Sequence, residues 1–452
     1  MKILIAGGGK VGSALARQLS IEGYDLTLID SNQHVLESNM QRYDVMAVHG
    51  NCASMDTLVE AGIKETDLLI AVTNADEVNL LCCLTAHDIN PNLHTIVRIR
   101  NPEYSNQAYK MRESLALSLV VNLEKQAAVE IERLLMYPGF LKRDTFAKGR
   151  VEIVELRIDA KSKLCNIPLN SLNSVVKCSV LVCTVLRNGV ASAPDGNFVL
   201  LEGDRLFVTA PTANLTTLLK NLGVITHRVK RIILCGGGRI SYYLSQRLIG
   251  SGISIQIIEQ NKDRCVQLAE LLPSACIVNG DASDQNLLES EDLDDCDALI
   301  TITGLDELNM VISLYGNSQG VPQIITKLSR VENSRILDSL PLGSIICPKE
   351  LCCNTIVRYV RALHKQSGAA VAIHSIADGQ AEAVEFMVDS TTLHCHEKLK
   401  DLKFKKNVLV VCITHGAETE IPNGDSSFVE GDTVIVVTSS DAVIYQLNDI
   451  FE

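Results

Sequence analysis

The first part of the chain alternates short apolar runs with stretches in which apolar residues recur every three or four positions. Val11, Leu15 and Leu19 show this helical spacing directly after the first apolar run. Strands that alternate with helices in this way predict a doubly wound parallel α/β sheet with right-handed crossovers. The predicted strands are residues 2–6, 24–30, 46–48, 68–73 and 95–99.

The same pattern returns in the second half of the chain. The segment Ile3–Gly12, ILIAGGGKVG, is matched 229 residues later by Ile232–Ser241, IILCGGGRIS. The strands that follow this second segment are predicted in the same order, at residues 231–235, 254–259, 275–278, 298–303 and 323–327. A repeat of this length predicts two copies of one unit, each with its own sheet.

A helix and a β-rich module follow each α/β part. Helical spacing of apolar residues predicts helices over residues 123–135 and 351–364, which could pack on their own domain or cross over to join two subunits. Residues 154–158 instead alternate apolar and charged side chains, which predicts a half-buried strand. The other strands of these modules are predicted at residues 179–186, 205–209, 384–388, 408–414 and 433–438.

Length and repetition together set the expected domain organisation. A chain of 452 residues suggests three or four domains, and the duplication favours four. The turn sequences Pro194-Asp195-Gly196 and Glu202-Gly203-Asp204 have counterparts in the second module, and in each module these turns could line a shallow ligand site or a dimer face. We expect Rossmann-like domains at residues 1–122 and 227–348, followed by a crossover helix and β-rich module at 123–226 and 349–452.

Composition narrows the class of protein. The net charge of −13 argues against nucleic acid as a main partner, since phosphate binding needs a basic face. The longest apolar runs, such as residues 68–72, fall far short of the ~20 residues that cross a bilayer, and the opening residues are too short for a signal peptide. We therefore expect a cytoplasmic protein. Its 15 cysteines lie mostly in apolar stretches, which indicates reduced thiols packed in the core.

The glycine-rich segment near the N-terminus has the spacing of a dinucleotide-binding turn. Gly7 permits the tight turn, Gly9 lets a pyrophosphate approach the backbone, and Gly12 lets helix and strand pack closely. The phosphates would then face backbone amides at the start of a helix. Asp30 ends the second strand, where a carboxylate can accept hydrogen bonds from ribose hydroxyls and would repel a 2′-phosphate. This pattern favours NAD or an adenosine nucleotide over NADP.

Other candidate contacts lie at the ends of later strands, which surround the ligand crevice of such sheets. In the first copy these are Thr73 and Asn74 after the fourth strand and Arg98 with Arg100 on the fifth. In the second copy Thr303 and Lys327 stand in their places, and Glu259 replaces Asp30.

The second copy departs from the glycine pattern. Ser241 stands where the third glycine is expected, and its side chain could push the helix away from the strand and loosen the phosphate pocket. Arg239, at the position of Lys10, adds charge for phosphates. The second copy is therefore either a second nucleotide site or a degenerate structural domain.

The combination of motifs resembles the KTN/RCK family. The resemblance rests on the two glycine segments, Asp30, the segment Gly50–Ser54 with its partner Gly280–Ser283, and the β-rich modules that end in Glu-Gly-Asp. Two such units in one chain look like the regulatory subunit of the Trk potassium uptake system. The resemblance implies a ring of chains, as a homotetramer or dimer of dimers, docked on a membrane-embedded, Trk-type potassium-translocating subunit at the inner face of the membrane.

The resemblance also implies ligands and contact residues. Members of the family bind NAD or NADH and adenine nucleotides, so we expect NAD(H), with ATP or ADP as further candidates. The Gly-Asp-Ala-Ser match is complete only in the second copy, because Asn51-Cys52 replaces Asp-Ala in the first. The expected contacts are Gly7, Gly8, Gly9, Lys10, Val11, Gly12, Asp30, Asn51, Cys52, Thr73, Asn74 and Arg98 in the first copy, and Gly236, Gly237, Gly238, Arg239, Ile240, Glu259, Asp281, Ala282, Thr303 and Lys327 in the second.

The main alternative is a soluble NAD-dependent oxidoreductase, which needs an acid or base beside the nicotinamide. His34, His49, His87 and His94 do not recur in the second copy, so we expect no catalytic residue. A metal site is not expected either: in His394-Cys395-His396, taken as part of a strand, neighbouring side chains would point to opposite faces.

Overall fold

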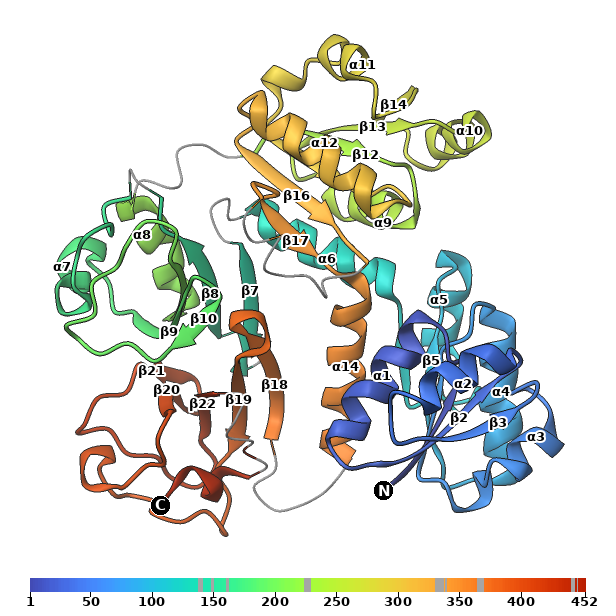
Figure 1. Ribbon diagram of the computed structural model, residues 1–452, viewed down its shortest axis with the longest axis horizontal. Helices are drawn as coiled ribbons and strands as arrows, with labels where there is room; N and C mark the ends of the chain where they lie inside the picture. The colour runs from blue at the N-terminus through green and yellow to red at the C-terminus, as the bar shows by residue number, and fades with distance from the viewer. Residues whose placement is uncertain are drawn as a thin grey trace. The chain divides into compact units, whose positions relative to one another are not determined.

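The computed structural model describes residues 1–136, 141–147, 150–159, 162–222, 229–329, 337, 340–363, 370–439, 444 and 446–452 (Figure 1). The first α/β domain holds a six-stranded parallel sheet in the order β3-β2-β1-β4-β5-β6. This is the doubly wound order, and the chain reverses direction across the sheet between β1 and β4. The strands are β1 Lys2–Ala6, β2 Asp25–Asp30, β3 Met46–His49, β4 Leu68–Ala71, β5 His94–Arg98 and β6 Leu119–Val121.

Helices cover both faces of this sheet, which explains why its central strands read as unbroken apolar runs. All four residues of β4 and the last four of β1 are buried. The helices are α1 Lys10–Ile21, α2 Gln33–Met40, α3 Met55–Glu60, α4 Asp76–Ile89 and α5 Pro102–Lys110.

The second α/β domain repeats this topology in the order β14-β13-β12-β15-β16-β17. The prediction of two Rossmann-like sheets in tandem is confirmed. The strands are β12 Arg231–Cys235, β13 Ser254–Glu259, β14 Cys276–Asn279, β15 Ala298–Thr301, β16 Gln323–Lys327 and β17 Ser344–Ile346. The helices that cover them are α9 Arg239–Leu248, α10 Lys262–Leu271, α11 Gln285–Ser290 and α12 Asp306–Ser318.

The two crossover helices, α6 Leu123–Met136 and α14 Pro348–Leu363, pack on the domains of the opposite copy. One compact unit joins Met1–Ala127 to Cys347–Val360, so most of α14 belongs with the first sheet. The other joins Ala128–Ile346 to Arg361–Glu452, and there the amide of Gln323 donates to the Leu134 carbonyl of α6 at 2.9 Å. The sequence left open whether these helices pack locally or join subunits. Within this chain they are exchanged between its two halves.

Each β-rich module is a five-stranded antiparallel sheet. The orders are β10-β9-β11-β8-β7 and β18-β19-β22-β20-β21. The first module contains β7 Lys142–Phe146, β8 Val151–Arg157, β9 Leu181–Arg187, β10 Val190–Ser192 and β11 Arg205–Pro211, with helices α7 Leu172–Val176 and α8 Thr212–Leu222. The second contains β18 Ala370–Ile376, β19 Ala381–Met387, β20 Val408–His415, β21 Glu418–Glu420 and β22 Thr433–Ser439.

The two modules share a buried apolar cluster, which corrects one prediction. Residues 154–158 were expected to form a half-buried strand, yet Glu155 is only 4% exposed. Side chains alternate along a strand, so Glu155 shares its face with Ile153. Ile153 packs in a cluster that also holds Ala383 and Ile435 of the second module. That face is therefore buried around Ile153 and Glu155, where Glu155 pairs with Arg205, and only Arg157 at the end of the strand remains exposed.

Candidate functional site

The first glycine loop joins β1 to α1 in a turn that only glycine fits at two positions. Gly7 has a φ of +104°, and a Cβ there would lie 2.9 Å from the backbone nitrogen of Thr73. A Cβ on Gly12 would lie 1.8 Å from the carbonyl oxygen of Gly7. Both distances are far below van der Waals contact, so these glycines set the close approach of loop, helix and sheet.

The next residues of the loop leave the start of α1 accessible. A Cβ added at Gly9 would meet nothing within 4 Å, and Gly9 and Lys10 are both exposed. Val11 is buried, so it can offer a ligand only its backbone amide. The start of α9 repeats this arrangement, with Gly238 and Arg239 exposed and Ile240 buried. The two helix N-termini therefore present backbone amides and one cationic side chain each, as phosphate binding requires.

An acidic side chain at the end of the second strand is bound to the glycine loop in both copies. The Gly8 amide donates to Asp30 Oδ2 at 2.7 Å, and the Asn32 amide donates to Oδ1 at 2.8 Å. In the second copy the amides of Gly237 and Asn261 donate to Glu259 at 2.7 and 2.8 Å. Each carboxylate oxygen retains a lone pair for a further donor. The longer Glu259 thus preserves the geometry of Asp30.

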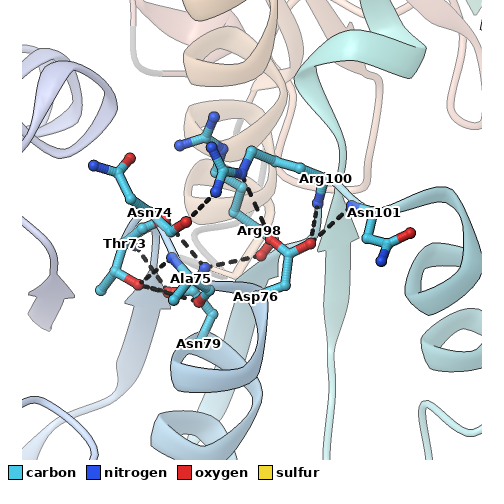
Figure 2. Close-up of polar contacts among 8 residues, drawn as sticks. All are labelled: Thr73, Asn74, Ala75, Asp76, Asn79, Arg98, Arg100 and Asn101. Carbon is cyan, nitrogen blue, oxygen red and sulfur yellow. Dashed lines mark hydrogen bonds and ion pairs between the residues drawn. The ribbon is translucent and has the colours of Figure 1, made fainter. Parts of the chain in front are cut away.

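A polar network fixes the ends of β4 and β5 beside the loop (Figure 2). The side chain of Asn79, on α4, accepts from the Thr73 amide at 2.8 Å and donates to the Arg98 carbonyl at 3.0 Å. Asn309 makes the same contacts with Thr303 and Lys327 in the second copy, at 2.9 and 3.0 Å. These two asparagines were not predicted from the sequence, although both are fully buried polar residues repeated in apolar helices.

A second missed residue is Asp76, at the start of α4. Its Oδ2 accepts from the amides of Arg100 and Asn101 at 2.9 and 2.7 Å (Figure 2). Arg100 in turn donates to the carbonyl oxygen of Asn74. Asp306 repeats part of this arrangement by accepting from the Ser329 amide at 2.8 Å. These bonds hold the segments after β4 and β5 together at the carboxyl end of the sheet.

Arg98 supplies a partly buried positive charge at this edge. Burial lowers the pKa of its guanidinium, while the nearby Glu124 carboxylate opposes that shift. Among the described residues, its buried Nε has no hydrogen-bond partner. Lys327 takes the equivalent place and donates to the Thr303 carbonyl oxygen. Arg98 is thus suited to an anionic group in the first crevice, since a buried guanidinium gains most from a charged acceptor.

The segments after β3 and β14 place two of the predicted contact residues in the domain cores and two at the surface. Cys52 and Ala282 are buried in the cores of their domains, so each can offer a ligand only its backbone atoms. Asn51 and Asp281 are exposed and form equivalent turns, in which their side chains accept from the amides of Ala53 and Ser283 at 3.0 and 2.9 Å. The bonds from Ser283 lower the pKa of Asp281.

The Ser241 hydroxyl closes its turn with a hydrogen bond, and the serine is accommodated between helix and loop. Its side chain is fully buried, and its hydroxyl donates to the carbonyl oxygen of Gly236. In the first copy the equivalent carbonyl oxygen belongs to Gly7, and a Cβ at Gly12 would overlap it. In the second copy the close contact is thus replaced by a hydrogen bond, and Gly236 keeps a φ of +109°.

No metal centre accompanies the crevices among the residues that the structure describes. The segment His394-Cys395-His396 was taken as part of a strand, which is wrong. It forms turns in which His394 and His396 have φ values of 60° and 68°. The cysteines behave as predicted, since eleven of the fifteen are buried. Burial raises the pKa of Cys235 and of Cys296 to about 12, which keeps both thiols protonated at neutral pH.

The described part of the chain contains no helix that is both long enough and apolar enough to span a bilayer.

Comparison with known families matches both kinds of domain. The TrkA-N domain family matches residues 3–121 and 232–348, and the TrkA-C domain family matches residues 153–223 and 383–451. The Trk system potassium uptake protein TrkA homolog of Archaeoglobus fulgidus is 30% identical over 451 residues, covering 100% of each chain. The Trk system potassium uptake protein TrkA of Haemophilus influenzae is 26% identical over 460 residues, covering 100% of this chain and 99% of that protein.

Solved structures show the same fold at lower identity. The GsuK RCK domain has a TM-score of 0.61 and 15% identity, covering 97% of this chain and 92% of its own. The GsuK channel bound to NAD also gives a TM-score of 0.61 at 15% identity, covering 97% of this chain and 77% of its own. Repeated pairs of one α/β domain and one β-rich module are thus a fold shared with RCK proteins.

Proposed function

Because the chain belongs to the TrkA family of potassium uptake proteins, we propose that it binds NAD(H) or ATP/ADP and thereby gates a membrane potassium transporter. Membership confirms the resemblance to tandem KTN/RCK proteins that the motifs indicated. The relatives are named potassium uptake proteins rather than enzymes, so the oxidoreductase alternative is set aside. The domain limits 1–122, 123–226, 227–348 and 349–452 remain our proposal for this chain.

The observation that carries the ligand proposal is the repeated pairing of a glycine-loop amide with an acidic side chain. Gly8 with Asp30 and Gly237 with Glu259 have the same 2.7 Å bond in both copies. A carboxylate held at the end of the second strand is positioned for ribose hydroxyls, and the adjacent helix N-terminus for phosphates. The proposed contacts are the loop residues, the acidic residue and the basic residue on β5 or β16.

The first crevice is also placed to influence a crossover helix. Burial raises the pKa of the Cys352 thiol, on α14, to about 12. The positive charge of nearby Arg98 opposes this shift. A phosphate bound by Arg98 would therefore change the charge beside α14. A ligand shifts an equilibrium only through different affinities for the two states, so such a change suffices without catalysis.

The remaining parts of the proposal concern the assembly. We place the protein in the cytoplasm, peripheral on the inner face of the membrane through a Trk-type potassium-translocating subunit. We propose self-association as a homotetramer or dimer of dimers. The relatives' names support the transport role, and the shared fold with the GsuK RCK domain supports a channel-regulating assembly.

Potassium uptake in living cells tests this function. In cells that lack the gene, the native chain is expected to restore growth at low external potassium, and Asp30→Ala to restore it poorly, because the substitution removes a ribose contact. Asp44→Ala is the matched control, since it makes the same charge change at an exposed residue. Equal rescue by Asp30→Ala and Asp44→Ala would exclude the first crevice as the regulatory site, and normal uptake in the deletion strain would exclude the transport role.

A further inference from the structure

The two β-rich modules meet with approximate twofold symmetry. Arg150 donates to the Gly416 carbonyl, and Gln380, the residue at the equivalent turn of the second module, donates to the Gly189 carbonyl. The acceptors lie in equivalent two-residue hairpin loops, between β9 and β10 and between β20 and β21. Contacts that occur twice with the partners exchanged define an isologous interface, here between two halves of one chain.

A residue close to a twofold axis contacts the equivalent residue of the other module, and Asp144 and His374 make such a contact. Asp144 is opposite Ile153 between β7 and β8, and His374 is opposite Ala383 between β18 and β19. Ile153 and Ala383 are the first residues of the two TrkA-C matches, so Asp144 and His374 occupy one position of the repeat. His374 Nδ1 lies 2.9 Å from Asp144 Oδ1.

The surroundings of Asp144 and His374 exclude most solvent, so the stability of the contact depends on which two side chains face each other. The side chains of His374 and Asp144 are only 15% and 13% exposed. The His374 ring lies 4.6 Å from the ring of Phe146, centroid to centroid, and Phe146 belongs to the buried cluster shared by the modules. A charged group at this depth is costly unless a partner of opposite character faces it.

We propose that the Asp144–His374 pair selects the pairing of a first module with a second module and rejects pairing between like modules. Two first modules in this arrangement would place one aspartate against another, and two second modules one histidine against another. Neither combination forms the acid–base contact, because two carboxylates repel each other and two imidazoles lack a carboxylate partner. One position of the repeat is thus an aspartate in the first module and a histidine in the second. This difference favours pairing of a first with a second module and disfavours pairing of like modules.

The selected partner is the opposite module of the same chain. Each chain carries one first module and one second module. If like modules could pair between chains, each chain would bind two other chains, and the chains would form an open-ended polymer. Closing the contact within the chain leaves neither module free, because an isologous surface is satisfied by a single partner. This inference concerns how the chain pairs its own modules and is independent of the proposed ligand and transporter.

The test is a charge-swap cycle in the full chain at neutral pH. Asp144→His places histidine against histidine, and His374→Asp places aspartate against aspartate; each is expected to lower the midpoint of thermal unfolding by roughly 5 °C. The double variant Asp144→His/His374→Asp restores the pair with its roles exchanged, so it should regain most of that loss.

Two results would overturn the proposal. One is that both single variants melt like the native chain, since the pair would then select nothing. The other is that the double variant melts no higher than the less stable single variant, because the contact itself would then not be what each single change removed. If a single variant fails to fold, recovery or failure of the double variant still decides the question.

Discussion

Gly12→Ser is expected to destabilise the first α/β domain by about 3 kcal/mol and to abolish nucleotide binding there. The new Cβ would lie 1.8 Å from the Gly7 carbonyl oxygen, a backbone atom that cannot move without opening the turn. Gly7 in turn contacts the backbone of Thr73, so relaxation would displace the loop from the end of β4. The free energy of unfolding, measured in urea, and the affinity for NADH report the two effects.

The chain supplies matched controls for this substitution. Ser241→Gly makes the reverse change at the equivalent position and removes the hydroxyl bond to Gly236, which should cost roughly 1 kcal/mol. Gly9→Ala adds a methyl group where nothing lies within 4 Å, so it should leave stability within roughly 1 kcal/mol while hindering a phosphate. A Gly12→Ser protein as stable as the native chain would show that this turn accommodates a side chain without strain.

Arg187→Ala is expected to destabilise the first β-rich module by about 3 kcal/mol. Arg187 Nε and Nη2 each donate to an Asp204 oxygen at 2.7 Å, and Asp204 is only 1% exposed. Hydrogen bonding to that carboxylate raises the pKa of Arg187. Without the guanidinium, the buried Asp204 carboxylate would retain the Leu201 amide, which donates to its Oδ2 at 2.8 Å. Chemical unfolding of the native and variant chains measures the cost.

The second module again provides the control. His415 Nδ1 lies 2.8 Å from Asp432 Oδ2, in the place of Arg187 and Asp204. Arg187→His should therefore lose less stability than Arg187→Ala, because it retains one donor for the carboxylate. Equal losses for the two variants would contradict a role for the hydrogen bond. The aspartate of the repeated Glu-Gly-Asp sequence is thus a buried structural carboxylate in both modules.

The α/β domains were predictable because each strand is an apolar run bounded by glycine or polar residues. The strands β1, β12, β13 and β16 fall at the predicted residues. The three-residue edge strands β6 and β17 were missed, since each is too short to show a period. The burial of Glu155 was also unpredictable, because it depends on a module more than 200 residues away covering that face.

The candidate site was predictable where a residue type is demanded by backbone geometry or by ligand chemistry. Gly7, Gly12 and Asp30 lie together at the loop, as their spacing indicated. Cys52 was placed there only by resemblance, and its side chain lies in the core. Asn79 was missed because a polar residue within a helix gives no sign, from one copy, of which backbone atoms it will bind. Its recurrence as Asn309 was the available signal.

Nucleotide binding at the Gly7 loop through Asp30 is tested most directly by calorimetric titration of the 452-residue chain with NADH. Native protein and Glu259→Ala should both retain a binding event at the first crevice, whereas Asp30→Ala should weaken that event roughly tenfold or more, because it removes hydrogen bonds to the ribose. Equal affinity in the native and Asp30→Ala proteins, or no heat of binding with NADH or ATP in the native chain, would contradict the account.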